Sequence, residues 1–308
     1  MRLQNIQLPD SDICAEEELY FHRNGDWIDF NGYFNLFYIE KRKKYTNQEN
    51  LCLHLNVKKC SAIHLVHDSQ ILQEIKLTSN TPLLFEFPYE NTDKGVFLVL
   101  YKDKHNWKNV LPEITGYYEG ICSEQKDVRI AAVVCTFKRE LYVLRNLKRV
   151  IRFLEKEENA SLNLCYWLID NGKTLSANKE ISRLIEQYPD NFKIIENRNV
   201  GGAGGFTRGM IEAIAEKQKF GLTHVQLMDD DASFDPELFI RAYGFLSMRK
   251  AEYQDITLGG ESLTRGLSLY SAGGRRMVCQ FCSAEWFSIG RFKKVWNLYT
   301  WVYVWAHT

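Results

Sequence analysis

The first third of the chain consists of short hydrophobic runs that alternate with polar positions. In the segment NLCLHLNVKKCSAIHLVHD, Leu51, Leu53 and Leu55 fall on one face of an extended strand, because successive side chains of a strand point to opposite faces. Further runs such as PLLFEFPYE and KGVFLVLYKD follow, separated by residues typical of turns. The pattern predicts an all-β unit over about residues 15–120, and we expect a β-sandwich whose aromatic side chains form the core.

After a polar stretch at residues 119–127 the pattern changes to alternating strands and helices. Apolar runs predict strands at residues 129–135, 162–169, 193–196 and 225–228. Between them lie amphipathic helices, the first with an apolar stripe of Leu141, Leu144, Leu147, Val150, Ile151 and Leu154, and another follows from Asp235-Pro236 to about residue 250. This order is typical of a doubly wound parallel sheet. We therefore expect a β-sandwich domain at residues 1–122 and an α/β domain at residues 123–308.

Charge and cysteine content exclude several classes of protein. The chain has 39 Lys and Arg against 39 Asp and Glu, so its formal net charge is zero and we expect no nucleic-acid partner. Its eight cysteines are scattered as in a reduced, cytoplasmic protein, and Cys279 and Cys282 lack the second pair that a zinc site needs. The first twenty residues are too polar for a signal peptide, and no apolar run is long enough to span a membrane.

Polar residues gather where the four predicted parallel strands end. In sheets of this kind, ligands bind outside the carboxyl ends of the strands. The groups that follow the strands in chain order are residues 136–139, 170–172, 197–205 and 229–231. Because all four groups fall at the same edge of the predicted sheet, they predict one shared ligand site.

The third group is rich in glycine and opens a helix. Gly201, Gly202, Gly204 and Gly205 lie between Asn199 and Arg208, which are groups that favour anions. Glycines allow the backbone to approach a ligand closely, and amides at a helix N-terminus attract phosphate. A P-loop requires a lysine after the glycines, and none is present. A dinucleotide-binding turn would follow the first strand, whereas this run follows the third. The alternative is a loop that only permits tight packing of helix on strand.

The fourth group consists of Asp229, Asp230 and Asp231. Three adjacent carboxylates repel one another, so their clustering favours a bound divalent cation, with a solvated acidic turn as the alternative. Side chains alternate along an extended segment, and we therefore expect Asp229 and Asp231 to bind Mg²⁺ or Mn²⁺ while Asp230 points toward a sugar or ribose. Arg139 suits phosphates or a base, or an ordinary solvated helix start. Asp170 suits a base contact or the turn before Asn171.

Together these motifs resemble a known enzyme family. The chain has CTFKRE after the first strand, IDNG after the second, NRNVGGAGGFTRGM after the third and LMDDD after the fourth. It resembles the galactofuranosyltransferases, which belong to the inverting glycosyltransferase family 2 and have the GT-A fold. The resemblance extends over most of the chain, because polymerising members also begin with a β-sandwich and continue with G-G motifs, seen here as LGGESL and SAGGRRMV.

The resemblance implies a UDP-galactofuranose donor, a glycan or lipid-linked glycan acceptor in cell-surface polysaccharide assembly, and in-line displacement assisted by a general-base carboxylate. It further implies that Asp229 and Asp231 hold the metal, that Arg139, Asp170 and Asn199 contact UDP, and that the glycines border the donor. The full set of donor-binding residues that we predict is Thr136, Arg139, Asp170, Asn199, Gly201, Gly202, Gly204, Arg208 and Asp230.

The end of the chain departs from this family. The general base and a metal-binding histidine are expected beyond an aromatic segment, but the sequence stops at TWVYVWAHT, so we assign no base and no role to His307, and we expect the domain to be incomplete. The aromatic run at residues 295–306 follows Arg291, Lys293 and Lys294, which suits either a peripheral membrane contact or a strand or helix that lacks its cover. Self-association is left open.

Two other functions remain after this reasoning. One is a related family 2 transferase that uses another donor, such as an activated rhamnose. The other is a non-catalytic carbohydrate-binding protein, in which the β-sandwich binds glycan and the second domain is degenerate.

Overall fold

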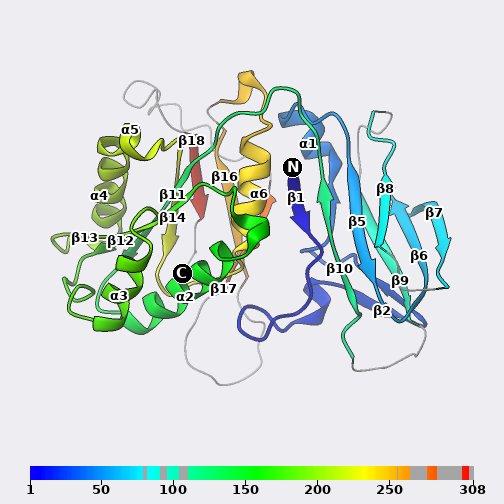
Figure 1. The fold of residues 1–308 in the computed structure, drawn as a ribbon, viewed down its shortest axis with the longest axis horizontal. Coiled ribbons are helices and arrows are strands. Elements are labelled where there is room, and N and C mark those ends of the chain that lie inside the picture. Colours follow the sequence, from blue (N-terminus) through cyan, green and yellow to red (C-terminus); the bar gives the residue numbers. More distant parts are fainter. Residues whose placement is uncertain are drawn as a thin grey trace. The chain divides into compact units, whose positions relative to one another are not determined.

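The computed structural model describes residues 1–78, 82–90, 96–103, 110–254, 256–263, 276–282 and 300–304. The chain forms two compact units, which are Met1–Lys126 with Gly244–Glu252, and Asp127–Tyr243 with Tyr253–Thr308 (Figure 1). The first unit is therefore discontinuous in sequence, because a short segment from far along the chain completes it. Each unit is considered by itself below.

The first unit contains two antiparallel sheets. One has the strand order β1 (Arg2–Asn5), β10 (Ile114–Glu119), β5 (Cys52–Val57), β8 (Pro82–Glu86). The other has the order β2 (His22–Asn24), β3 (Trp27–Asp29), β9 (Val96–Asp103), β6 (Cys60–His67), β7 (Gln70–Lys76), and β4 (Phe37–Tyr38) also pairs with β9. The register alternates as expected, since Leu53 and Leu55 of β5 are buried while His54 is not.

Aromatic side chains join the two sheets. Tyr118 of β10 stacks on Phe37 of β4, with ring centroids 4.7 Å apart, and Phe87 lies against the same tyrosine. All three rings are buried. Contact between rings from both sheets is the packing of a β-sandwich. The aromatic residues of this region thus serve mainly as core.

One helix interrupts the expected all-β pattern. Helix α1 (Ile39–Tyr45) has the sequence IEKRKKY, in which Ile39, Arg42 and Tyr45 are buried. Residues three apart share a helix face, but seven residues are too few to display the periodicity in a sequence. Arg42 is the informative member, since its Nη1 donates to the carbonyl oxygen of Gly244 at 3.2 Å and so ties in the late segment of this unit.

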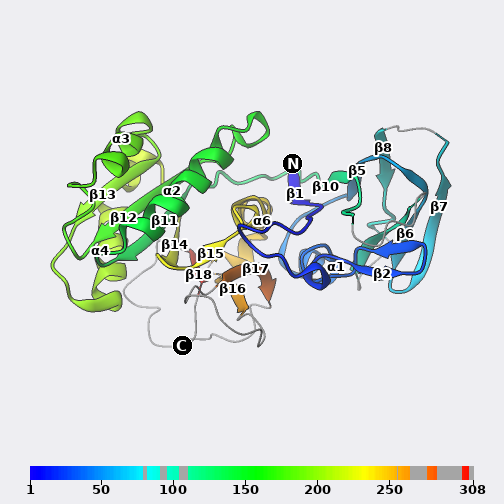
Figure 2. The ribbon, with the colours of Figure 1, turned by 90° about the horizontal axis from the view of Figure 1, so that it is seen from below.

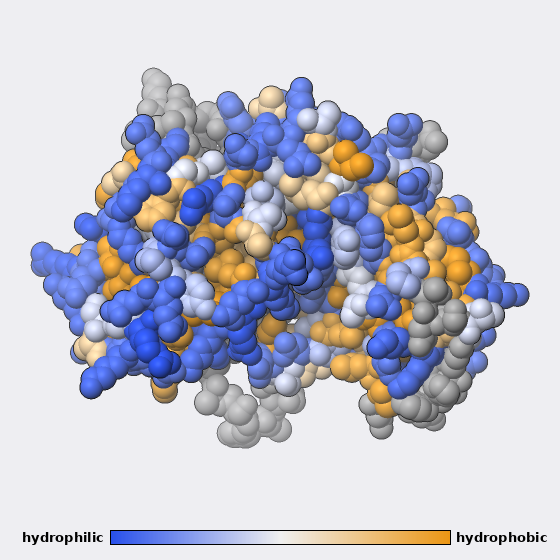
Figure 3. Space-filling model, viewed as in Figure 1, coloured by the Kyte–Doolittle hydropathy of each residue, from blue (hydrophilic) through white to orange (hydrophobic). Residues whose placement is uncertain are grey.

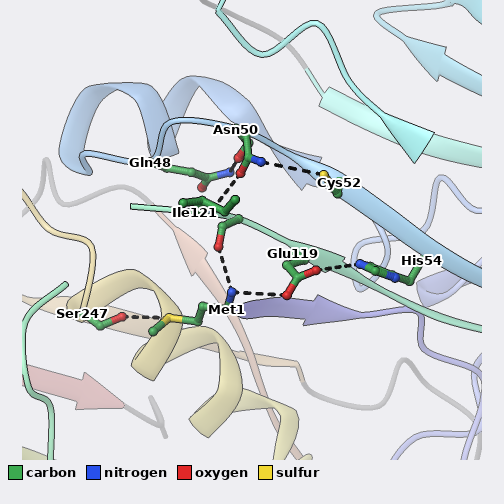
Figure 4. A network of polar contacts seen from close by, with 9 residues as sticks. Met1, Gln48, Asn50, Cys52, His54, Glu119, Ile121 and Ser247 are labelled. Atoms are coloured by element: carbon green, nitrogen blue, oxygen red, sulfur yellow. Dashed lines mark hydrogen bonds and ion pairs between the residues drawn. The ribbon is translucent and has the colours of Figure 1, made fainter. Parts of the chain in front are cut away.

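A polar network links the first sheet to the same late segment (Figure 4). The α-amino group of Met1 donates to the carbonyl of Gly120 at 2.9 Å and lies 3.4 Å from Glu119 Oε1, while the Ser247 hydroxyl donates to Met1 Sδ. The other carboxylate oxygen of Glu119 lies 2.6 Å from His54 Nε2. Burial raises the pKa of Glu119, but the bonds from His54 and the α-amino group outweigh it and leave the pKa lowered.

Each sheet of the first unit ends in a strand with apolar surface. Leu84 of β8 and Ile71 and Leu72 of β7 are exposed by 61%, 54% and 40%. Figure 3 shows hydrophobic surface on this side of the unit. Edge strands with such side chains are the places where sheets associate. Whether this chain self-associates stays a prediction.

The second unit is built on one mixed sheet. Its strand order is β13 (Phe192–Glu196), β12 (Leu164–Asp170), β11 (Ile130–Thr136), β14 (His224–Asp229), β18 (Thr300–Val304), β16 (Leu258–Leu263), β17 (Arg276–Cys282), β15 (Ser233–Phe234). All pairs are parallel except β16 with β17. The four predicted strands are confirmed as the parallel strands β11, β12, β13 and β14, of which β13 and β14 are longer than predicted and β12 is shorter.

Helices cover both faces of this sheet. They are α2 (Glu140–Leu154), α3 (Lys179–Gln187), α4 (Gly201–Ala215), α5 (Lys217–Phe220) and α6 (Glu237–Leu246) (Figure 2). Helix α4 packs closely on β11, because a Cβ at Gly209 would lie 2.2 Å from Val133. Tyr166 points to the opposite face, where the charges of Arg145 and Arg149 on α2 act on it. The arrangement is the layered α/β structure that alternating strands and helices require.

Three helical predictions need correction. The stripe of α2 is rotated, because Leu141 is 83% exposed while Val143 and Phe153 are buried. Helix α6 ends at Leu246 instead of about residue 250, and the segment that follows pairs with the first unit through a bridge between Thr46 and Arg249. The glycine run lies within the first turn of α4 instead of forming a separate turn before it.

Candidate functional site: the carboxyl edge of the parallel sheet

The predicted groups meet at one edge of the second unit's sheet. Thr136 at the end of β11 pairs in register with Asp170 at the end of β12. On the other side of β11, Cys135 pairs with Asp229, the last residue of β14. Strand β13 ends beside β12, where the amide of Asn197 donates to the carbonyl of Asp170 at 3.0 Å. The convergence that the strand order predicted is thus present in the structure.

The acids at the end of β14 are held by groups from β11 and the start of α2. Asp230 is buried, and its Oδ2 accepts a hydrogen bond from Thr136 Oγ1 at 2.6 Å. Arg139 Nη1 donates to Asp230 Oδ1 at 3.3 Å and also to Asp231 Oδ2. Because β14 ends at Asp229, strict alternation does not continue through the acids. Asp230 and Asp231 share the guanidinium of Arg139, and the orientation of Asp230 toward a sugar or ribose stays a prediction.

Charge at this edge is strongly coupled. Burial raises the pKa of Asp230 and the negative charge of Asp231 adds to the rise, whereas Thr136 and Arg139 act in the opposite direction. The hydrogen bond to Asp231, with the charge of Asp230, raises the pKa of Arg139. The Arg139 side chain is 47% exposed, so the guanidinium reaches the acids from the solvent side. Adjacent carboxylates repel one another unless positive charge lies close by, and the guanidinium of Arg139 supplies part of that charge.

Asp170 holds a turn. It is fully buried, and its two carboxylate oxygens accept hydrogen bonds from the amides of Gly172 and Leu175 at 2.9 and 2.7 Å. Of the two roles that the sequence left open, these are the contacts of the turn. Thr136, equally buried, serves the acids through its hydroxyl.

The glycines divide into two functions. Gly205 allows close packing, because a Cβ there would lie 2.1 Å from Cys135 Sγ. Gly201 and Gly202 have no such neighbour within 4 Å, and Gly201 has a φ of +77°, which favours glycine. Asn199 Oδ1 accepts from the Gly201 amide at 3.2 Å. Helix α4 is thus open at its start and packed at Gly205. The packing alternative drawn from the sequence applies to Gly205, and a ligand role for Gly201 and Gly202 stays a prediction.

Arg208 lies further along the same helix. Its guanidinium forms an ion pair with Glu212 at 3.1 Å, and Glu212 also binds Lys193 of β13. The side chain is 45% exposed. Its contact is with its own helix and not with the strand-end groups described above.

Two asparagines at this edge were not singled out from the sequence. Asn171 donates to the carbonyl of Gly201 at 3.3 Å and accepts from Asn197 at 2.8 Å, so it joins the ends of β12 and β13 to the start of α4. Asn146 of α2 is buried and donates to the carbonyls of Asp230 and Ala232. The signal for Asn146 was present, since it is an amide next to the apolar stripe of a helix.

The carboxylates at this edge suit a divalent cation whose coordination is completed by oxygen atoms of a bound ligand. Carboxylate oxygens are the donors that Mg²⁺ and Mn²⁺ prefer, and Asp229 and Asp231 are both partly exposed. In the described part of the chain, no group of three or more His, Cys, Asp or Glu side chains is arranged to hold a metal by itself. Mg²⁺ in nucleotide sites is commonly bound by one or two carboxylates together with substrate phosphates. The chemistry of the edge therefore suits a metal that arrives with a diphosphate.

The order of strands, the glycine-start helix and the acids after β14 can now be compared with known proteins. Residues 131–253 match the model of glycosyl transferase family 2. The matched segment is less than half of the 308 residues, and it contains every donor and metal residue predicted above. A family 2 domain implies the GT-A fold, a nucleotide-sugar donor and a glycan acceptor, and it supports glycosyltransferase activity. The identity of the sugar is not part of this match.

Solved structures add little. A family two carbohydrate esterase from Clostridium thermocellum shares 9% identity over 72% of this chain and 87% of its own, with a TM-score of 0.19. A formyltetrahydrofolate deformylase from Pseudomonas putida shares 7% identity over 58% and 60%, with a TM-score of 0.20. At such scores no shared fold is indicated, and no conclusion about this chain follows. No curated protein matches the sequence.

The C-terminal predictions lie mostly outside the described residues. His307 and the basic residues at 291–294 are among these, and so is most of the run at residues 295–306. Its middle forms β18, which pairs with β14 on one side and β16 on the other. Cys279 and Cys282 fall in β17, of which only the backbone is described. Among the described residues, none of the helices is both long and apolar enough to cross a membrane.

Proposed function

We propose that this chain is an inverting, metal-dependent glycosyltransferase that transfers galactofuranose from UDP-galactofuranose to a growing cell-surface glycan. One observation carries the proposal. The acids that follow β14 and the first turns of α4 lie at the same edge of the sheet, because Cys135 of β11 pairs with Asp229 while its Sγ faces Gly205 of α4. Amides at a helix start attract anions and carboxylates attract cations, which supports the binding of a metal diphosphate at this edge.

The choice of donor rests on the sequence motifs. The run NRNVGGAGGFTRGM followed by LMDDD resembles the galactofuranosyltransferases, and the family 2 match supports only the broader class. We assign UDP-galactofuranose on that resemblance, with another activated sugar such as rhamnose as the competing donor.

The described residues serve the leaving-group side of the reaction. An acceptor hydroxyl attacks the anomeric carbon and gives its proton to the general-base carboxylate that the resemblance implies, while the bond from that carbon to the diphosphate breaks and UDP leaves. The Gly202 amide can donate to a phosphate oxygen, while the Gly201 amide is bonded to Asn199 Oδ1. Arg139 can exchange its carboxylate partners for the phosphate oxygens of the diphosphate. Thr136 and Asp170 keep the strand ends in place. A divalent cation bound by Asp229 and Asp231 would neutralise diphosphate charge.

Binding experiments test this function directly. We expect UDP to bind in the presence of Mn²⁺ and to bind far more weakly after chelation, as measured by calorimetry. UDP-galactofuranose should compete with UDP, whereas a thymidine-linked rhamnose should not. If only the rhamnose nucleotide binds, the donor assignment changes from UDP-galactofuranose to an activated rhamnose. If neither binds, and glycan binds with no effect of Mn²⁺, the chain is a carbohydrate-binding protein.

A further inference from the structure

A buried asparagine holds the backbone of the acidic turn. Asn146 lies in the middle of α2 and is 1% exposed. Its Nδ2 donates to the carbonyl oxygen of Asp230 at 3.0 Å and to that of Ala232 at 3.1 Å. The side-chain amide of Asn146 therefore binds the backbone carbonyl before Asp231 and the one after it. A helix that is distant in sequence thus fixes the conformation of the turn.

The orientation of this amide is determined by a cation behind it. Arg149, one turn further along α2 and also buried, donates from Nη1 to Asn146 Oδ1 at 3.4 Å. A guanidinium cannot accept a hydrogen bond and a carbonyl cannot donate one. The amide therefore has only one satisfactory orientation, with its oxygen toward Arg149 and its nitrogen toward the turn.

The carboxylates of the turn depend on this support. Asp230 has its side chain fixed by Thr136, but Asp231 is partly exposed and has Arg139 as its described partner. When a ligand draws Arg139 away, the direction of the Asp231 carboxylate depends on its own backbone. That backbone is the segment that Asn146 clamps at residues 230 and 232.

We infer that Asn146, with Arg149 behind it, is a positioning residue that presents Asp231 to the metal diphosphate. The inference rests on the function proposed above. Groups that orient metal ligands from behind commonly change metal affinity by about 10-fold to 100-fold when they are removed. Asn146 is expected to act in this way without touching the ligand.

The test compares two buried asparagines of similar chemistry. Asn159 is 2% exposed, and its Nδ2 donates to the carbonyl of Phe153 at 2.8 Å, which has no part in the acidic turn. Asn146→Ala and Asn159→Ala each remove an amide from a buried backbone carbonyl, so both should lower the melting temperature. Asn146→Leu and Asn159→Leu keep a side chain of similar size without adding charge, and remove the hydrogen-bonding amide.

Calorimetric titration with Mn²⁺, and with UDP in the presence of Mn²⁺, separates the two sites. We expect both Asn146 variants to lose about 10-fold or more in affinity for Mn²⁺, and both Asn159 variants to stay close to the wild type. Equal affinity in all four folded variants would overturn the inference and leave the proposed function standing. Parallel losses at both positions would also overturn it, since the effect would then follow stability. If the wild type itself bound neither probe, the proposed function would fall and the inference with it.

Discussion

At the scale of single residues, Arg139 is the most informative side chain. Its guanidinium donates hydrogen bonds to the carboxylates of Asp230 and Asp231, where the sequence predicts a metal. A guanidinium and a divalent cation compete for the same oxygens, because both are attracted by the same negative charge. On the proposed function, we therefore expect Arg139 to oppose binding of the free metal and to favour binding of a diphosphate.

This competition predicts opposite effects on two ligands. Arg139→Ala should strengthen binding of Mn²⁺ alone several-fold, because a competing positive charge is removed from the acids. The same variant should weaken binding of UDP in the presence of Mn²⁺. Calorimetry measures both quantities. Arg152→Ala, an exposed arginine on the same helix, is the control and should change neither. Loss of both affinities together would show that Arg139 only maintains the structure.

The two kinds of glycine in the first turn of α4 are also separable. Gly205→Ala places a Cβ against Cys135 Sγ and should lower the free energy of unfolding by about 1–3 kcal/mol. Cys135→Ala in the same chain should recover part of this loss. Gly202→Ala meets no atom within 4 Å and should be neutral or stabilising by up to about 1 kcal/mol.

Urea unfolding measures these stabilities, and UDP binding completes the comparison. If the backbone at Gly202 approaches the diphosphate, Gly202→Ala weakens UDP binding without loss of stability. Unchanged UDP binding in this variant would contradict a ligand role for the open end of the helix.

At the scale of elements, a hydrogen bond between side chains links two strands of the first sheet of the N-terminal unit. Glu119 of β10 binds His54 of β5 across the sheet, with 38% of its side chain exposed. Because the pKa of Glu119 is lowered in the folded state, its contribution to stability is present at pH values above the unfolded pKa of about 4.3 and is lost as the pH falls through the folded value.

Replacement of this carboxylate tests the pH dependence. Glu119→Gln should be less stable than the wild type near pH 6, by less than about 1 kcal/mol because the pair is partly exposed. The difference should shrink as the pH falls below the unfolded pKa of about 4.3, and should vanish only below the lowered pKa of the folded state, where the wild-type carboxylate is protonated. Chemical denaturation at a series of pH values measures it. A difference that persists at low pH would assign the effect to packing.

At the scale of the whole molecule, the chain forms two units, and each unit is made of two separate stretches of the sequence. Residues 244–252 complete the first unit, through contacts with Arg42, Thr46 and Met1. A boundary drawn at residue 122 from the polar stretch therefore leaves out part of the N-terminal unit. The structure divides the chain after Lys126 and again after Tyr243.

Arg42 provides a test of this discontinuous unit. Arg42→Met keeps a long side chain but removes the hydrogen bond to the Gly244 carbonyl, and should lower the free energy of unfolding by about 1–3 kcal/mol. Lys44→Met, on the exposed side of the same helix, should have little effect. UDP binding in the second unit should be unaffected in both variants. A stability equal to that of the wild type in Arg42→Met would show that the late segment contributes little to the first unit.

The sequence by itself determined the parts that depend on local pattern. Continuous apolar runs such as residues 129–135 are typical of buried strands, and their alternation with helices predicts a parallel sheet. Because the carboxyl ends of parallel strands lie at one edge, the sequence also predicted that Thr136, Asp170 and the acids at residues 229–231 lie together, as the strand register shows. The glycine and aspartate motifs then indicated a glycosyltransferase, a class that the family 2 match supports.

Only the tertiary structure decided which groups touch. The contacts of Arg139 with Asp230 and Asp231, and the packing of Gly205 on Cys135, depend on atoms that are far apart in sequence. The same is true of Asn146, whose bonds to residues 230 and 232 span more than 80 positions. Periodicity reports which face of an element is buried, whereas hydrogen bonds between elements depend on how those faces meet. For that reason the location of the site was predictable from the sequence, and its internal contacts were not.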